Sequence, residues 1–255
     1  DAVEALINNS AALYDIKTDL AKVYDLERLM TRIIYKAANA KDVKALGATC
    51  RILPQLKSDL SQISTQLTRS LDKKISPLDD IADLVERAIA DEPPALMKDG
   101  GYIKNGFNEE LDRLRNITGG GKDLLAQIEQ QEKEATGIKN LRVGYNRVFG
   151  YYIEVSKGNV SMVPDRYVRK QTLTNGERYI TDELKKIENE ILGANDKILA
   201  LEAAIFAEVR EFIAQRLDLI QQTAESVAAL DVLCSYAVVS IENNYCRPMM
   251  ANDSV

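Results

Sequence analysis

The side chains best suited to bind a partner lie together in one basic segment, from Ile138 to Thr181. Between Lys139 and Arg178 the chain has eight Lys or Arg and three Asp or Glu residues, a net charge of +5. The whole chain carries −6, so the residues outside this window carry −11. Cations separated from acidic surroundings in this way are typical of a surface that contacts a polyanion.

Cationic, amide and hydroxyl side chains of this segment are our candidates for contacts with phosphate oxygens. They gather at two predicted turns and on the strand before the second turn: Asn146, Arg147, Arg169, Lys170, Gln171, Thr174, Asn175 and Arg178. Arg147, Lys170, Asn175 and Arg178 are the leading candidates among them. The acidic composition of the rest of the chain argues against the alternative, an ordinary solvated surface.

Aromatic residues in the same segment allow two interpretations. They could stack nucleobases, or they could fill the core of a thin sheet; the residues concerned are Tyr145, Phe149, Tyr151, Tyr152, Tyr167 and Tyr179. The core interpretation is favoured, because Tyr145, Tyr151 and Tyr179 can fall on the apolar face.

The cysteines do not suggest a catalytic or metal centre. Cys50, Cys234 and Cys246 are odd in number and far apart, no CxxC pair is present, and histidine is absent. This argues against a structural zinc site and against a Cys/His nucleophile. We expect reduced thiols that are buried or idle, and we predict no catalytic residue and no metal.

The sequence Gly119-Gly120-Gly121-Lys122 does not form a Walker A motif. That motif needs a Gly where this chain has Asn116, and a Ser or Thr where it has Asp123. Carboxylate pairs such as Asp79-Asp80 stand at predicted helix starts, where the helix dipole explains them. We therefore predict no nucleotide or other cofactor in this chain.

Hydrophobic periodicity predicts helices over most of the remaining sequence. The predicted spans are 2–8, 12–29, 42–53 (ending before Pro54), 58–71, 78–90 (with Pro77 in its first turn), 108–136, 182–217 and 219–245. The helix over 108–136 contains Gly119 to Gly121, each costing about 1 kcal/mol relative to Ala, and the sequence leaves open whether it kinks there. Apolar residues from Leu184 to Ile205 form a seam, which predicts antiparallel packing of the two long helices.

Alternating apolar and polar residues predict four strands in two hairpins between the two long helices. The strands start near Leu141, Tyr151, Tyr167 and Arg178, and Asn175-Gly176 is a strong hairpin signal. The connection 157–166 suggests that both turns lie at the same, free end of the sheet. The fold class is therefore mainly α (α+β), a multihelical domain whose long antiparallel helices carry an inserted four-stranded antiparallel sheet.

Composition indicates a soluble, cytoplasmic protein. The chain has 255 residues, of which 45% are hydrophobic and 28% charged. No apolar run approaches the roughly 18 residues that span a bilayer, and no secretory signal opens the chain. Because it starts at Asp1 without Met and stops soon after Arg247-Pro248, we expect a fragment of a longer protein.

Several segments resemble the MutS family of bacterial DNA mismatch-repair proteins. Leu141 to Val155 and Arg169 to Ile180 resemble the family's clamp, and Tyr24 to Leu29 resembles its core. Ala229 to Leu233 and Tyr245 to Pro248 resemble its return helix and the junction to its ATPase domain. The resemblance spans nearly the whole chain in the family's order.

The resemblance implies a lever/core domain, 1–137 and 191–255, with an inserted clamp domain, 138–190. It implies a clamp that grips the backbone of duplex DNA, and a second protomer in the intact protein. ATP and Mg would belong to an ATPase domain absent here, so this region is expected not to be an enzyme. The alternatives are a helical scaffold whose sheet binds another protein, and a single-stranded nucleic-acid binder.

Overall fold

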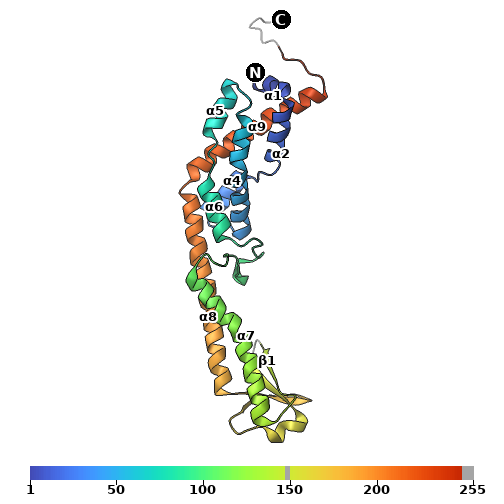
Figure 1. Cartoon of the computed structure of the whole chain (residues 1–255), viewed down its shortest axis with the longest axis vertical. Helices are drawn as coiled ribbons and strands as arrows, with labels where there is room; N and C mark the ends of the chain where they lie inside the picture. Colours follow the sequence, from blue (N-terminus) through green and yellow to red (C-terminus); the bar gives the residue numbers. More distant parts are fainter. Residues whose placement is uncertain (147–149, 249–255) are drawn as a thin grey trace. The chain divides into compact units, whose positions relative to one another are not determined.

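The computed structural model describes residues 1–146 and 150–248. It is mainly helical with one four-stranded antiparallel sheet, which confirms the predicted fold class. Internal contacts divide the chain into two compact units, Asp1–Phe107 with Ala204–Val255, and Asn108–Ala203. The predicted clamp, 138–190, lies within the second unit, which contains the sheet (Figure 1).

Several helices of the first unit start at side-chain caps. Asp25 accepts the Arg28 N–H at the start of α3, and Asn39 forms a capping box with Asp42 at the start of α4. The helices of this unit are α1 (Ala2–Asn8), α2 (Ser10–Leu20), α3 (Leu26–Ile34), α4 (Ala40–Leu60), α5 (Gln66–Lys74), α6 (Asp79–Ala88), a short 3-10 turn η1 (Met97–Asp99), the end of α8 (Asp182–Ala214) and α9 (Leu217–Glu242).

The predicted helix break at Pro54 is wrong. α4 continues through Pro54 to Leu60, and the next helix starts only at Gln66. A proline inside a helix costs about 3 kcal/mol, but Leu53, Leu56 and Leu60 lie almost completely out of solvent. Burying each leucine contributes about 1.5–3 kcal/mol, so packing on both sides of the proline outweighs its cost.

The start of α6 also differs from the prediction. Pro77 precedes the helix instead of lying in its first turn, because Leu78 adopts a left-handed conformation with φ 55° and α6 begins at Asp79. Leu78 is buried. Its packing therefore holds a backbone conformation that a branched residue rarely adopts.

The prediction that no apolar run approaches the length of a membrane span does not hold for α9. Within the described residues it is the helix long and apolar enough to cross a membrane by length and composition, with an 18-residue window of mean hydropathy 1.5. It packs against α1, α2, α3 and α5, and Ile220, Leu230 and Ala237 have no solvent exposure. These contacts are those of a central core helix.

The second unit pairs α7 (Glu109–Thr136) with the first part of α8 (Figure 1). Asn108 caps α7 by accepting the Leu111 N–H at 2.9 Å. Gly119 to Gly121 are helical within α7, so the three glycines do not end the helix.

The sheet has the strand order β1-β2-β4-β3. Its strands are β1 (Arg142–Asn146), β2 (Gly150–Ser156), β3 (Val168–Thr172) and β4 (Gly176–Ile180). The four predicted strands and both predicted hairpins are confirmed.

The prediction that both hairpin turns lie at one end of the sheet is wrong. β2 and β4 are antiparallel, and the last residue of β2, Ser156, pairs with the first residue of β4, Gly176. The second turn therefore lies at the end of the sheet opposite the first. The connection 157–167, which includes η2 (Lys157–Met162), is long enough to carry the chain back along the sheet before β3 begins.

One apolar core joins the sheet to both long helices. Its buried residues come from α7, the strands, their connections and α8: Ile128, Ile138, Leu141, Ile153, Val155, Tyr167, Tyr179 and Leu184. Because the core includes the last turns of α7 and the first turn of α8, the sheet is fixed to both helices.

Candidate nucleic-acid interface

The strand residue that follows the first predicted turn lies beside α8. Asn146 ends β1, Arg147 lies outside the described residues, and Gly150 begins β2. Gly150 has φ 74°, and a Cβ added there would lie 1.8 Å from Oε1 of Glu188 on α8. This end of the sheet therefore faces a carboxylate, which repels a phosphate group.

The second predicted turn presents exposed polar groups. The Leu173 N–H donates to the Gly176 carbonyl at 2.8 Å, and Thr174 and Asn175 at the corner are exposed. Lys157 lies beside this turn, because its N–H donates to the Asn175 carbonyl at 3.0 Å. The turn thus brings a hydroxyl, an amide and an ammonium group to one end of the sheet.

Lys170 is the extra residue of a β-bulge in the edge strand β3. Arg169 and Gln171 both have partners on β4, but the pairing skips Lys170. A bulge redirects side chains, and Lys170 is exposed. The Arg169 guanidinium lies 3.4 Å from Oε1 of Glu177, a weak and exposed ion pair.

Arg178 and Gln171 lie side by side, and their polar groups bond to each other and to other side chains of the sheet. Arg178 Nε donates to Oε2 of Glu154 at 2.9 Å, and Nη1 donates to Oε1 of Gln171 at 3.0 Å. The guanidinium also lies 4.2 Å from the centre of the Tyr152 ring. Glu154 balances the charge of Arg178, so this arginine is held as part of the sheet surface.

Tyr152 occupies its place because β1 has no side chain opposite. A Cβ added to Gly144 would lie 2.8 Å from Cζ of Tyr152. Gly144 and Tyr152 are paired across β1 and β2. The glycine thus makes room for the ring on which Arg178 stacks.

The predicted candidates therefore separate into three groups. Asn146 pairs with Gly150, the residue beside Glu188 of α8. Gln171 and Arg178 lie within a network on the sheet, and Arg169, Lys170, Thr174 and Asn175 lie on and after the edge strand. We call the last four, together with Lys157, the β3-edge surface. Sequence reasoning missed Lys157, although it lies inside the basic window. Among the described residues, Lys157 and Lys170 have no carboxylate within ion-pair distance.

A buried carboxylate on α7 fixes the strand connection. Glu132 is 3% exposed and accepts both Nη1 and Nη2 of Arg166, at 2.8 and 2.5 Å. It also accepts the Tyr167 hydroxyl at 2.8 Å. The ion pair raises the pKa of Arg166, and burial followed by the hydrogen bond to Glu132 raises the pKa of Tyr167.

A second carboxylate, one turn earlier on α7, holds β1. Glu129 accepts the Val143 N–H at 2.9 Å and Nζ of Lys133 at 2.6 Å. The Lys133 hydrogen bond, followed by the Val143 N–H, lowers the pKa of Glu129. Two carboxylates on one helix face thus attach the sheet at both β1 and the β2–β3 connection.

An ion pair also joins α7 to α8. Arg115 Nη2 donates to Oε1 of Glu202 at 2.5 Å, and Glu202 has no solvent exposure. Sequence reasoning missed both Glu132 and Glu202. The available signal was their spacing, since Glu132 follows Ile128 by four residues and Glu202 precedes Ile205 by three, which places both on apolar stripes.

The aromatic residues of the sheet divide between the core and the surface, and Phe149 lies outside the described residues. Tyr167 and Tyr179 are buried, and Tyr151 packs against the core cluster. Tyr145 is 53% exposed and leans on Tyr151, with ring centroids 4.9 Å apart. Burial, followed by a 2.5 Å hydrogen bond from its hydroxyl to Glu177, raises the pKa of Tyr179 to about 12.

The thiols and carboxylates do not assemble a reactive centre in the part of the chain that the structure describes. Burial, more than the nearby Asp80, raises the pKa of Cys50 to about 12, and burial raises that of Cys234 to about 11. No group of three or more Cys, Asp or Glu side chains among these residues has the arrangement of a metal site.

Comparison with known proteins identifies the family. Residues 106–197 match the model described as MutS family domain IV. A DNA mismatch repair protein MutS from Caldicellulosiruptor bescii is 50% identical over 248 residues, which is 97% of this chain and 29% of that protein. MutS proteins from Caldicellulosiruptor saccharolyticus and Halothermothrix orenii are each 46% identical, covering 98% and 100% of this chain and 29% and 28% of those proteins.

The chain therefore spans less than a third of the length of these relatives. The residues matched to domain IV, 106–197, include all of α7, the whole sheet and the start of α8 as far as residue 197. The sequence resemblance, the fold and the comparisons agree, and the chain belongs to the MutS family as a region that contains its domain IV.

Proposed function

We propose that this region grips the phosphate backbone of duplex DNA with the β3-edge surface. The observation that supports the proposal is the exposed set of Lys157, Lys170, Thr174 and Asn175 around one edge strand and its turn. These groups can bind phosphate oxygens, and phosphate contacts carry no sequence information. Binding would be independent of sequence.

The sheet is attached to both long helices of its unit. Glu129 and Glu132 attach it to α7, and the apolar core attaches it to α8. α8 is unbroken for 33 residues, which corresponds to about 50 Å. We propose that these helices act as a lever between the DNA-gripping sheet and an ATPase domain outside this chain.

Further parts of the proposal follow from the family. The parent protein would use ATP and Mg in that ATPase domain, act in the cytoplasm, and close around DNA together with a second protomer. Each named relative is a mismatch repair protein. This region would contribute the backbone grip, while mismatch sensing would belong to other domains.

Fluorescence anisotropy of a labelled homoduplex, titrated with the chain at several salt concentrations, tests the proposal. The double variant Lys157→Gln/Lys170→Gln should bind more weakly, with a log-log salt slope shallower by about 1.8. The matched control Lys73→Gln/Lys74→Gln removes two exposed lysines of α5 and should bind like the wild type. Equal slopes for all three proteins would refute the assignment to the β3-edge surface. No binding by the wild type would show that this region alone does not grip DNA.

Two other functions make different predictions in the same assay. A protein-binding sheet would give no detectable binding of the duplex at any of the salt concentrations. A single-stranded binder would prefer an unpaired oligonucleotide, because stacking needs accessible rings. The burial of Tyr167 and Tyr179 weighs against stacking on those two rings.

A further inference from the structure

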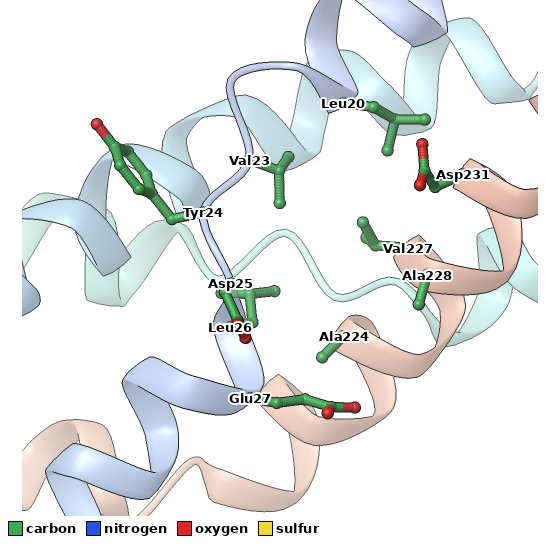
Figure 2. A pocket seen from close by; sticks show the side chains of 10 residues that line it. All are labelled: Leu20, Val23, Tyr24, Asp25, Leu26, Glu27, Ala224, Val227, Ala228 and Asp231. Atoms are coloured by element: carbon green, nitrogen blue, oxygen red, sulfur yellow. The ribbon is translucent and has the colours of Figure 1, made fainter. Parts of the chain in front are cut away.

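The first unit contains an apolar groove along the junction of α3 and α9. One cavity of about 430 Å³ lies between the end of α2, the start of α3 and α9 (Figure 2). A second cavity of about 330 Å³ lies further along the same two helices. Both are lined by Leu26, Glu27 and Ala224, so the two cavities are neighbours along the same pair of helices, and together we call them the α3–α9 groove.

The dimensions of the groove suit one short helix. On α9 its lining runs from Leu217 to Asp231. At 1.5 Å per residue this is about 21 Å, the length of a helix of roughly 14 residues. A groove of this kind between packed helices is a common site for the apolar face of an amphipathic helix.

The floor of the groove is apolar. Leu26, Ala224 and Val227 are buried at its base. Figure 2 shows Leu20 and Val23 facing Val227 across the opening. Further along, Met30, Ile34 and Leu217 continue the apolar lining.

The charged residues that line the groove are all acidic. Asp25, Glu27 and Asp231 line the first cavity, and neither cavity is lined by Lys or Arg. Asp25 already accepts a hydrogen bond from the Arg28 N–H at the start of α3, so one of its carboxylate oxygens is engaged within the chain. Glu27 and Asp231 are exposed, and no ion pair involves either of them among the residues that the structure describes. An apolar segment flanked by cations therefore complements this surface, whereas an acidic segment is repelled.

We propose that the α3–α9 groove binds an amphipathic helix of a partner protein, with leucine-like residues on its apolar face and Lys or Arg beside them. The apolar side chains would fill the floor, and the cations would meet Glu27 and Asp231. This proposal does not depend on the DNA contact, because the groove and the sheet belong to different units.

A defined peptide tests the proposal with the intact chain. The probe is a fluorescein-labelled helical peptide of about 14 residues, with leucines spaced three and four residues apart and lysines flanking them. Its control carries Glu in place of every Lys. The lysine peptide should bind the chain, and the glutamate peptide should bind at least tenfold more weakly.

Variants locate the binding. Glu27→Gln/Asp231→Asn keeps the side-chain shapes and should lower the affinity for the lysine peptide by about five- to tenfold. Ala228→Trp, at an exposed position of the groove, should abolish binding, whereas Ala207→Trp, at an exposed position of α8 that does not line it, should not.

Three results would overturn the proposal. They are equal binding of both peptides, no binding by the folded wild type, and wild-type affinity in Ala228→Trp. Sedimentation of the chain without peptide tests one further occupant. A dimer that Ala228→Trp dissociates would mean that a second copy fills the groove, which also overturns the assignment to a partner helix.

Discussion

Removing the charge of Glu132 should loosen the sheet from α7. In Glu132→Gln the amide retains one acceptor for Arg166 or Tyr167 but loses the charge and the two-pronged contact. A hydrogen bond to a charged group contributes about 1.5–3 kcal/mol. The side chain of Arg166 is 49% exposed, so water offsets much of its loss. The remaining cost is about 2 kcal/mol, most of it at the buried end of the contact.

Hydrogen exchange measures this loss directly. A local opening that becomes about 2 kcal/mol easier should speed exchange of the sheet amides about 30-fold, with little change in the first unit. The matched control is Glu134→Gln, the same substitution at an exposed position two residues along α7; it should change stability by less than about 0.5 kcal/mol. If both variants exchange alike, the buried contact does not hold the sheet, and the reasoning fails.

Three further predictions concern single groups. Gly144→Ala should displace the Tyr152 ring, since the new Cβ would lie 2.8 Å from it, and should lower the free energy of unfolding by about 1 kcal/mol in a denaturant titration; an unchanged midpoint would contradict this. The pKa of Glu129 is lowered in the folded chain, so its contribution to folding stability is present above the unfolded pKa of about 4.3 and is lost as pH falls through the folded pKa. Glu129→Gln should therefore lose less stability than the wild type as the pH is lowered in this range. An identical fall of stability with pH in both proteins would refute the contact. Exposed Cys246 should react with a thiol reagent in the native chain, while Cys50, buried and with its pKa raised to about 12, should react only after unfolding; equal rates would contradict the packing of α4.

Local sequence signals were sufficient for most of the secondary structure, although the single helix predicted over 12–29 is wrong, because α2 ends at Leu20 and α3 begins at Leu26. The alternation of Tyr151, Ile153 and Val155 predicted β2, and these residues do face the core. Pro54 shows the limit of local rules. The prediction weighed the proline alone, whereas the buried leucines on both sides of it decide the outcome.

The pairing of the two hairpins could not be predicted locally. Asn175-Gly176 specifies one hairpin, but it carries no information on which end of the sheet that hairpin's turn will occupy. The direction is set by the β2–β3 connection, whose Val163 packs against the core and whose Tyr167 is buried there. These are long-range contacts. They place the two turns at opposite ends of the sheet, so the candidate residues of the two turns do not form one surface.

The anchoring carboxylates were hidden for a different reason. A glutamate on a predominantly charged helix is usually solvated, so the burial of Glu132 was not predicted. Its spacing from Ile128 placed it on the buried stripe, yet its partner Arg166 is 34 residues away in the chain. A charged residue on an apolar stripe predicts that a partner exists, but the sequence does not say which residue it is.

The edge position of β3 has a consequence for handling the protein. One side of this strand pairs with β4, and the sheet ends on its other side, where an unpaired edge can recruit a strand from another molecule. The bulge at Lys170 interrupts the regular edge, and Arg169 and Lys170 place two adjacent cations along it. Like-charged edges repel each other, so the same cations that would hold DNA also keep copies of the chain apart. Neutralising them should therefore promote aggregation, and light scattering should accompany every binding measurement on such variants.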